Sequence, residues 1–94
     1  MVLERAELQI RAGMEIDFAT AMAERGLVVL RSVPGVESVR MGRGVENPGK
    51  FMLLVEWRSL DAHAAFSRLP EFAVFLDIIK PFSTGGSMEH FTFD

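Results

Sequence analysis

The stretch Lys50–Phe66, KFMLLVEWRSLDAHAAF, decides the fold of this chain. Its first half predicts a strand, because apolar side chains occupy every second position. These positions are Phe51, Leu53, Val55 and Trp57. The intervening residues Met52 and Leu54 are apolar as well, so we expect both faces of the strand to be covered, as in the centre of a sheet. After Trp57 the chain leaves the strand, and Ser59 is placed to cap a helix.

The segments before this stretch predict a strand, a helix and a second strand. Residues 2–10 and 36–45 alternate in hydropathy as strands do, and residues 14–32 have the amphipathic spacing of a helix. Between the second and third strands, Asn47-Pro48-Gly49-Lys50 predicts a type II turn, because it offers Pro at the second position and Gly at the third. We therefore expect these two strands to form an antiparallel hairpin.

The segments after this stretch predict a second helical region and a last strand. Pro70 breaks the helical region, since a proline suits the first turn of a helix and disrupts its interior. Residues 83–87 are rich in Ser, Thr and Gly and predict a loop. Residues 88–93 predict the last strand, with Phe91 and Phe93 on one face and His90 on the other.

The resulting order, β-α-β-β-α-β, predicts an α+β fold of the ferredoxin-like type in a single domain, residues 1–94. Right-handed crossovers arrange it as a four-stranded antiparallel sheet with two helices on one face. The other sheet face is then bare, and on the central strand either alternating set of residues is too apolar for water. We therefore expect a homodimer in which the two sheets pack face to face.

The composition excludes several classes of function. The net charge of −3 disfavours a polyanionic partner, so we expect no nucleic acid partner. The chain has no Cys, which excludes disulfides and thiolate metal sites. No stretch approaches the ~18 consecutive apolar residues of a membrane span, so we expect no membrane association and a cytoplasmic protein.

A set of short motifs runs through nearly the whole chain. They are Val33-Pro34-Gly35, Asn47-Pro48-Gly49 with Phe51, Glu56-Trp57-Arg58-Ser59 with His63, Phe72 with Phe75, and His90-Phe91. With these motifs the chain resembles the antibiotic biosynthesis monooxygenase (ABM) superfamily of dimeric α/β barrels. The resemblance implies a sheet-to-sheet dimer in which each subunit keeps a pocket between its sheet and its helices. Some members oxygenate polycyclic aromatic substrates without a cofactor, some degrade haem, and many have no assigned activity.

Within that resemblance, Trp57 matches the superfamily's Trp at the end of the third strand. In the haem-degrading members this Trp works with an Asn on the first strand and a His on the second helix. Residues 3–10 contain no Asn, and His63 lies only six residues after Trp57, so the resemblance does not extend to a haem site. The polyketide-type members have polar pocket residues such as Asn, Tyr and Arg. Few of these have a counterpart in this chain, because it has no Tyr and its one Asn, Asn47, lies in a turn. We expect no cofactor and no metal.

The residue pattern and the resemblance together give the candidate site residues. Trp57 and His63 are the candidate catalytic residues, Trp57 to orient an aromatic substrate by stacking and His63 as a base. The candidate substrate-binding residues are Trp57, Phe18, Met22, Phe66 and Phe72. Each has a structural alternative, because an apolar stripe at helical spacing is typical of a core and His63 lies on the flank of its helix, as a surface residue would.

Two further polar residues have structural interpretations. His90 is a candidate for acid–base chemistry near neutral pH, although a hydrogen bond across a dimer is the expected role. Glu56 is expected to pair with Arg5 or Arg40 inside a barrel rather than to act in catalysis. Two functions stay open at this point. One is a cofactor-independent monooxygenase acting on an apolar aromatic substrate. The other is a non-catalytic dimeric barrel that binds a small apolar ligand or has a structural or stress-related role.

Overall fold

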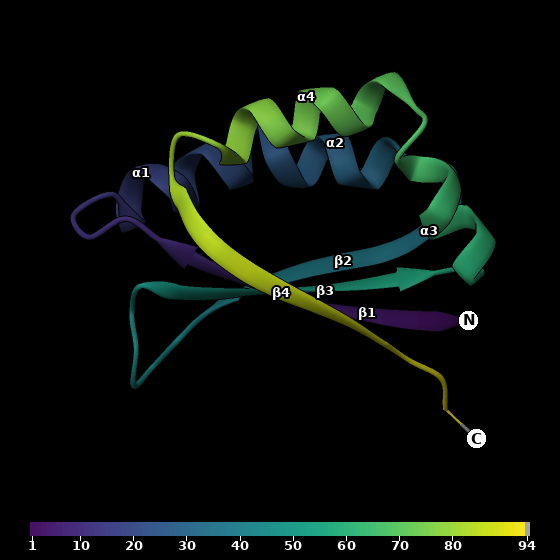
Figure 1. Ribbon diagram of the computed structural model, residues 1–94, viewed down its shortest axis with the longest axis horizontal. Helices are drawn as coiled ribbons and strands as arrows, with labels where there is room; N and C mark the ends of the chain where they lie inside the picture. Colours follow the sequence, from purple (N-terminus) through teal and green to yellow (C-terminus); the bar gives the residue numbers. More distant parts are fainter. Residues whose placement is uncertain (94) are drawn as a thin grey trace.

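Four strands form one antiparallel sheet in the computed structural model, which describes residues 1–93 (Figure 1). The strands are β1 (Val2–Ile10), β2 (Val36–Arg43), β3 (Lys50–Trp57) and β4 (Ser83–Phe91). Their order across the sheet is β2-β3-β1-β4, and each neighbouring pair is antiparallel. β1 and β3 are therefore the central strands, β2 and β4 are the edges, and the expected ferredoxin-like α+β fold is confirmed.

Two helical regions cover one face of this sheet (Figure 1). The first consists of α1 (Glu15–Ala21), the π-helical segment η1 (Met22–Gly26) and α2 (Leu27–Ser32), so the helix expected over residues 14–32 contains a wider turn in its middle. The second consists of α3 (Leu60–Phe66) and α4 (Pro70–Ile79). The predicted break is confirmed, because Pro70 is the first residue of α4. No described helix is long and apolar enough to cross a membrane.

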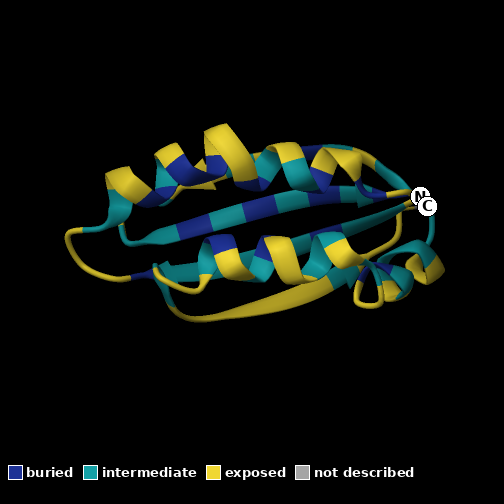
Figure 2. Ribbon diagram, turned by 90° about the horizontal axis from the view of Figure 1, so that it is seen from above, coloured by how far each residue is buried: buried dark blue, intermediate teal, exposed yellow. Residues whose placement is uncertain are grey.

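Burial alternates strictly along β3, and this decides which of its two faces meets the helices. The odd-numbered residues from Phe51 to Trp57 are all buried, whereas the residues between them are partly exposed on the opposite face. Phe18 of α1 packs edge-on against Phe51, with ring centroids 4.9 Å apart. Figure 2 shows the matching division in the helices, whose outer sides are exposed and whose inner sides are buried. The core therefore lies between the helices and the central strands.

The turn between β2 and β3 lies where the sequence predicts it, but its type differs. Lys50 N donates to Asn47 O at 3.0 Å, which closes the turn. Positive φ angles occur only at Gly13 and Gly35 among residues 1–93, so the type II assignment, which needs a positive φ at Gly49, is wrong. The Asn47 side chain explains the difference, because its Oδ1 accepts a hydrogen bond from Gly49 N at 3.2 Å and forms an Asx turn.

The last strand begins earlier than expected, and the loop predicted over residues 83–87 is wrong. β4 pairs with β1 from Ser83 onward, with Gly86 opposite Leu8. The backbones approach closely there, since a Cβ at Gly86 would stand 2.3 Å from Glu7 O. Pairing with a neighbouring strand overrides the weak strand propensity of this Ser- and Gly-rich stretch. Most of β4 is exposed at the edge of the sheet (Figure 2).

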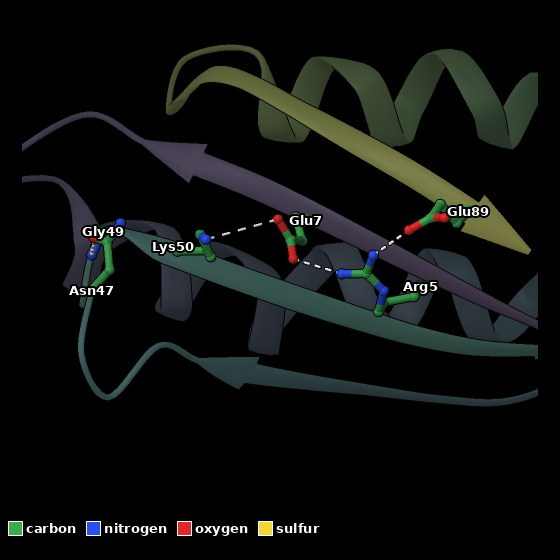
Figure 3. Close-up of polar contacts among 6 residues, drawn as sticks. All are labelled: Arg5, Glu7, Asn47, Gly49, Lys50 and Glu89. Carbon is green, nitrogen blue, oxygen red and sulfur yellow. Dashed lines mark hydrogen bonds and ion pairs between the residues drawn. The ribbon is translucent and has the colours of Figure 1, made fainter.

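The face of the sheet away from the helices carries a charged row, made of Arg5, Glu7, Glu89 and Lys50 (Figure 3). Arg5 Nη1 donates to Glu7 Oε1 at 2.6 Å, and Arg5 also pairs with Glu89. The expected pairing of Glu56 with an arginine is therefore wrong: Glu56 Oε1 accepts a hydrogen bond from Ser38 Oγ at 2.9 Å. Arg5 pairs instead with the carboxylates of Glu7 and Glu89.

Candidate functional site

Four side chains from four elements meet at the end of the sheet where β1 begins and β3 ends. They are Glu4 of β1, Trp57 of β3, His63 of α3 and His90 of β4, and we call them the polar cluster. Strand register brings three of them together, because Val2 lies opposite Trp57 and Glu4 lies opposite His90. The polar cluster thus depends on pairing between strands that are far apart in the chain.

Glu4 is the centre of the polar cluster and is only 8% exposed. Trp57 Nε1 donates a hydrogen bond to Glu4 Oε1 at 2.9 Å. His63 Nε2 lies 3.4 Å from the same oxygen. A buried carboxylate is tolerated in an apolar core only where polar groups compensate its lost hydration, and the indole N–H of Trp57 supplies that compensation here.

The rings of the polar cluster pack edge to face. The centroid of His63 lies 5.2 Å from that of Trp57 and 4.4 Å from that of His90. The centroid of the Phe66 ring lies 5.8 Å from that of Trp57. Within the described residues, His90 Nε2 is buried and has no hydrogen-bond partner. The polar cluster therefore contains one polar atom that the other residues described here leave unsatisfied.

Contacts at the N-terminus of α3 position the His63 side chain against the sheet. Ser59 caps the helix, since its Oγ accepts a hydrogen bond from Ala62 N at 3.1 Å. Gly35 lies against the same turn, with a φ of +92°, and a Cβ added there would stand 2.5 Å from Ala62 Cβ. Gly35 O also accepts a hydrogen bond from Arg58 N at 2.7 Å. These contacts fix α3 against the sheet, so the His63 side chain is only 22% exposed and does not lie free on the surface.

Burial lowers the pKa of His63 below its ordinary value of 6.5, because the imidazolium form loses hydration. The Glu4 carboxylate opposes this effect, and His90 adds to the lowering. The net direction is downward, so the His63 imidazole is mostly neutral at neutral pH. A neutral imidazole has a free lone pair, with which it can accept a proton or bind a cation.

A cavity of about 430 Å³ extends from the polar cluster between the sheet and the helices. Its walls come from β1, β3, β4, α2, α3 and α4 and are mostly apolar. Glu4 and His63 are among the few polar side chains that line it. The volume lies within the ~300–1,000 Å³ of typical small-molecule sites, which combine apolar walls with a few polar groups.

The structure divides the five residues predicted to bind substrate. Trp57, Phe66 and Phe72 line the cavity. Phe18 and Met22 do not line it, and both belong to the hydrophobic core, where they are 0% exposed. Helical spacing alone does not separate a core residue from a cavity residue, so the expectation that these two border the cavity has no support in the structure.

Glu4 and the position of His90 were missed by reasoning from the sequence. Glu4 stands on the apolar face of β1, between Val2 and Ala6, and a lone acid on such a face is the signal that points to a buried partner. The hydrogen bond of His90 across a dimer stays a prediction, and within this chain His90 lies beside His63 on the helix-covered face. The strand pattern placed His90 on the face opposite Phe91, which is correct. It did not show that the helices cover this face.

The fold and this site define a class of protein, namely a small ferredoxin-like protein whose apolar cavity ends at a buried carboxylate, an indole and an imidazole. The family model for antibiotic biosynthesis monooxygenase matches residues 1–77, and the chain belongs to this family. The resemblance that the motifs indicated is thereby confirmed.

Individual proteins are similar to this chain over nearly its whole length. YczJ of Bacillus subtilis (strain 168), an uncharacterised protein, is 29% identical over 93 residues, which is 97% of each chain. A Bordetella bronchiseptica protein named for the antibiotic biosynthesis monooxygenases superposes with a TM-score of 0.91 at 21% identity, over 99% of this chain and 96% of that one. SnoaB, a cofactor-independent oxygenase of Streptomyces nogalater solved as a point variant, gives 0.82 at 18% identity, over 98% and 91%. At these identities the two solved structures show a shared fold.

Proposed function

We propose that this protein is a cofactor-independent monooxygenase acting on a small, flat, apolar aromatic substrate held in the cavity. The observation that carries the proposal is the end of the cavity, where Glu4, Trp57 and His63 lie together beside walls that are mostly apolar. Membership of the family supports the same class of reaction, as does the likeness to SnoaB, whose name describes such an oxygenase.

The walls of the cavity favour an aromatic ligand. Phe66 and Phe72 both line it and meet edge to face, with ring centroids 5.2 Å apart. Trp57 lies next to Phe66, so a flat ring system that enters the cavity meets aromatic faces and edges. Its polar substituent would then lie at the polar cluster, where the polar lining is concentrated.

His63 is the proposed base. It takes a proton from an acidic group of the substrate, and Glu4, 3.4 Å away, stabilises the imidazolium that forms. The electron-rich anion then reacts with O₂ directly. One oxygen atom enters the product and the other leaves as water, and the substrate supplies every electron and both hydrogens of that water. The protein contributes orientation, the base and the exclusion of bulk water.

The alternative is a non-catalytic protein that binds a small apolar ligand, and one observation favours it. Trp57 and Glu4 already satisfy one another through their hydrogen bond, which leaves few polar groups free to act on a ligand. The two functions share the cavity and differ only in turnover. Oxygen consumption therefore separates them.

The proposed assembly is a homodimer formed through the bare sheet faces. Leu3, Met52 and Leu54 present apolar side chains on that face, beside the charged row. β4 adds a long exposed edge with apolar residues such as Phe91, which is 41% exposed. Apolar surface of this kind and an open strand edge favour association with a second copy.

The test uses tagless protein that has been treated with EDTA and returned to chelator-free buffer. Oxygen uptake is measured with an oxygen electrode in the presence of a panel of polycyclic phenols and quinols. Products formed under ¹⁸O₂ are analysed by mass spectrometry. We expect oxygen uptake, one ¹⁸O atom in the product, and a fall of about 10²–10⁴-fold in kcat for His63→Ala. Glu24→Gln, at an exposed position of η1 outside the cavity and the sheet face, is the matched control and should keep the rate. Saturable binding without uptake would favour the binding protein instead.

A further inference from the structure

We propose that Glu4, His63 and His90 form a three-ligand site for a divalent first-row transition cation such as Zn²⁺. One ligand atom from each residue lies within 4.8 Å of the other two. The three come from β1, α3 and β4, so the site exists only in the folded chain. The inference does not depend on turnover, because it would hold equally for a binding protein.

The donor set selects the class of cation. Two imidazoles and one carboxylate are typical of zinc and non-haem iron sites, whereas Ca²⁺ and Mg²⁺ prefer oxygen ligands alone. Zn–N and Zn–O bonds of about 2.0–2.1 Å place neighbouring tetrahedral ligands about 3.3 Å apart. The 3.4 Å between Glu4 Oε1 and His63 Nε2 matches one such edge, so closing the site requires only small side-chain movements.

His90 supplies independent support. Its Nε2 is buried and, among the residues described, has no hydrogen-bond partner. Buried polar atoms are nearly always satisfied, and an orphan of this kind is explained by a bound water molecule or ion. The lone pair of a neutral imidazole nitrogen is a good ligand for a transition cation. A cation bound by His90, His63 and Glu4 would give the buried His90 Nε2 a partner.

The surroundings resemble those of built metal sites. Trp57 Nε1 donates to the Glu4 carboxylate and holds it in place, as outer-shell partners commonly do for metal ligands. Glu4 and His63 also line the cavity, so a cation with three protein ligands would keep an open position towards it. Water or a polar group of a cavity ligand would occupy that position.

The cation and the proposed base compete for His63. A bound cation takes the lone pair with which His63 would accept a proton. Zn²⁺ should therefore inhibit oxygen uptake by the EDTA-treated protein, and a chelator should restore it. Failure of the metal proposal and failure of the proposed function are thus distinguishable, since metal binding is measured without substrate and turnover is measured without metal.

The experiment titrates the tagless, EDTA-treated protein with Zn²⁺ in a calorimeter and with Co²⁺ in a spectrophotometer. We expect one cation per chain and visible Co²⁺ bands of a nitrogen- and oxygen-coordinated ion. Loss of an outer-shell partner costs about 10–100-fold in metal affinity, and Trp57→Phe should weaken binding by that amount. His90→Ala and Glu4→Gln, which each remove a ligand, should weaken binding by more. Glu4→Gln keeps an acceptor for the indole, so the fold should survive, and circular dichroism checks this. Glu24→Gln, at an exposed position of η1, is the control. Absence of binding, or binding unchanged in His90→Ala and Glu4→Gln, would overturn the proposal.

Discussion

The indole Nε1 of Trp57 donates a hydrogen bond of 2.9 Å to Oε1 of Glu4, although 53 residues separate the two in the chain. Glu4 lies opposite Val55 in the β1–β3 ladder, two residues from Trp57, and both side chains reach the helix-covered face. One contact therefore joins the buried acid to the wall of the cavity. Trp57 shapes the cavity and at the same time makes the burial of Glu4 tolerable.

Replacing Trp57 by Phe tests this contact. The substitution keeps an aromatic ring but removes the N–H donor, so the Glu4 carboxylate stays buried with one partner fewer. We expect the free energy of unfolding to fall by about 1–3 kcal/mol, measured by urea denaturation. In a Glu4→Leu background the same change should cost clearly less, because no acid remains to be stranded. Equal costs in the two backgrounds would show that the hydrogen bond contributes nothing.

Two glycines provide a matched pair for testing how α3 is positioned. Gly13 and Gly35 have similar φ angles of +88° and +92°, but a Cβ at Gly13 would meet nothing within 4 Å, whereas at Gly35 it would stand 2.5 Å from Ala62 Cβ. Gly13→Ala should cost about 1–2 kcal/mol through backbone strain alone. Gly35→Ala should cost more and should also weaken binding of aromatic ligands, because α3 and His63 shift. If urea denaturation gives the same cost for both, the close packing of Gly35 does not position α3.

The bare sheet face predicts the assembly state. Light scattering at micromolar concentration should give about twice the chain mass of 10.5 kDa, because two apolar faces associate. Leu54→Lys places a charge on that face and should shift the mass towards the monomer. Val28→Lys, at an exposed apolar position on α2, is the control and should leave the mass unchanged. A stable monomer of the unaltered chain would contradict the proposed dimer.

Local signals made most of the fold predictable. The alternation in β1 and β3 and the capping residue Ser59 each mark an element without help from the rest of the chain. The first residue of α4, Pro70, marks its boundary in the same way. The beginning of β4 has no such signal, because residues 83–87 become a strand only through pairing with β1. The intrinsic strand propensity of a segment carries no information about long-range pairing of this kind.

The candidate site was harder to predict because strand register assembles it. Trp57 and His63 were recognisable from their motif, and both belong to the polar cluster. Glu4 and His90 join them only because the β1–β4 ladder sets these two residues opposite one another. The expectation of no metal rested on the absence of Cys and on the poor match to the haem site, whereas the three candidate ligands come from three separate elements that sequence spacing does not connect.

The central claim is that the cavity ending at Trp57 is the functional site, and fluorescence of this single tryptophan tests it most directly. Leu76→Phe adds volume inside the cavity, whereas Val74→Phe adds the same ring at an exposed position of α4. A polycyclic phenol is titrated into the unaltered protein and both variants. We predict saturable quenching in the unaltered protein and in Val74→Phe, with affinity at least about tenfold weaker in Leu76→Phe. No quenching, or equal affinity in all three proteins, would contradict the claim.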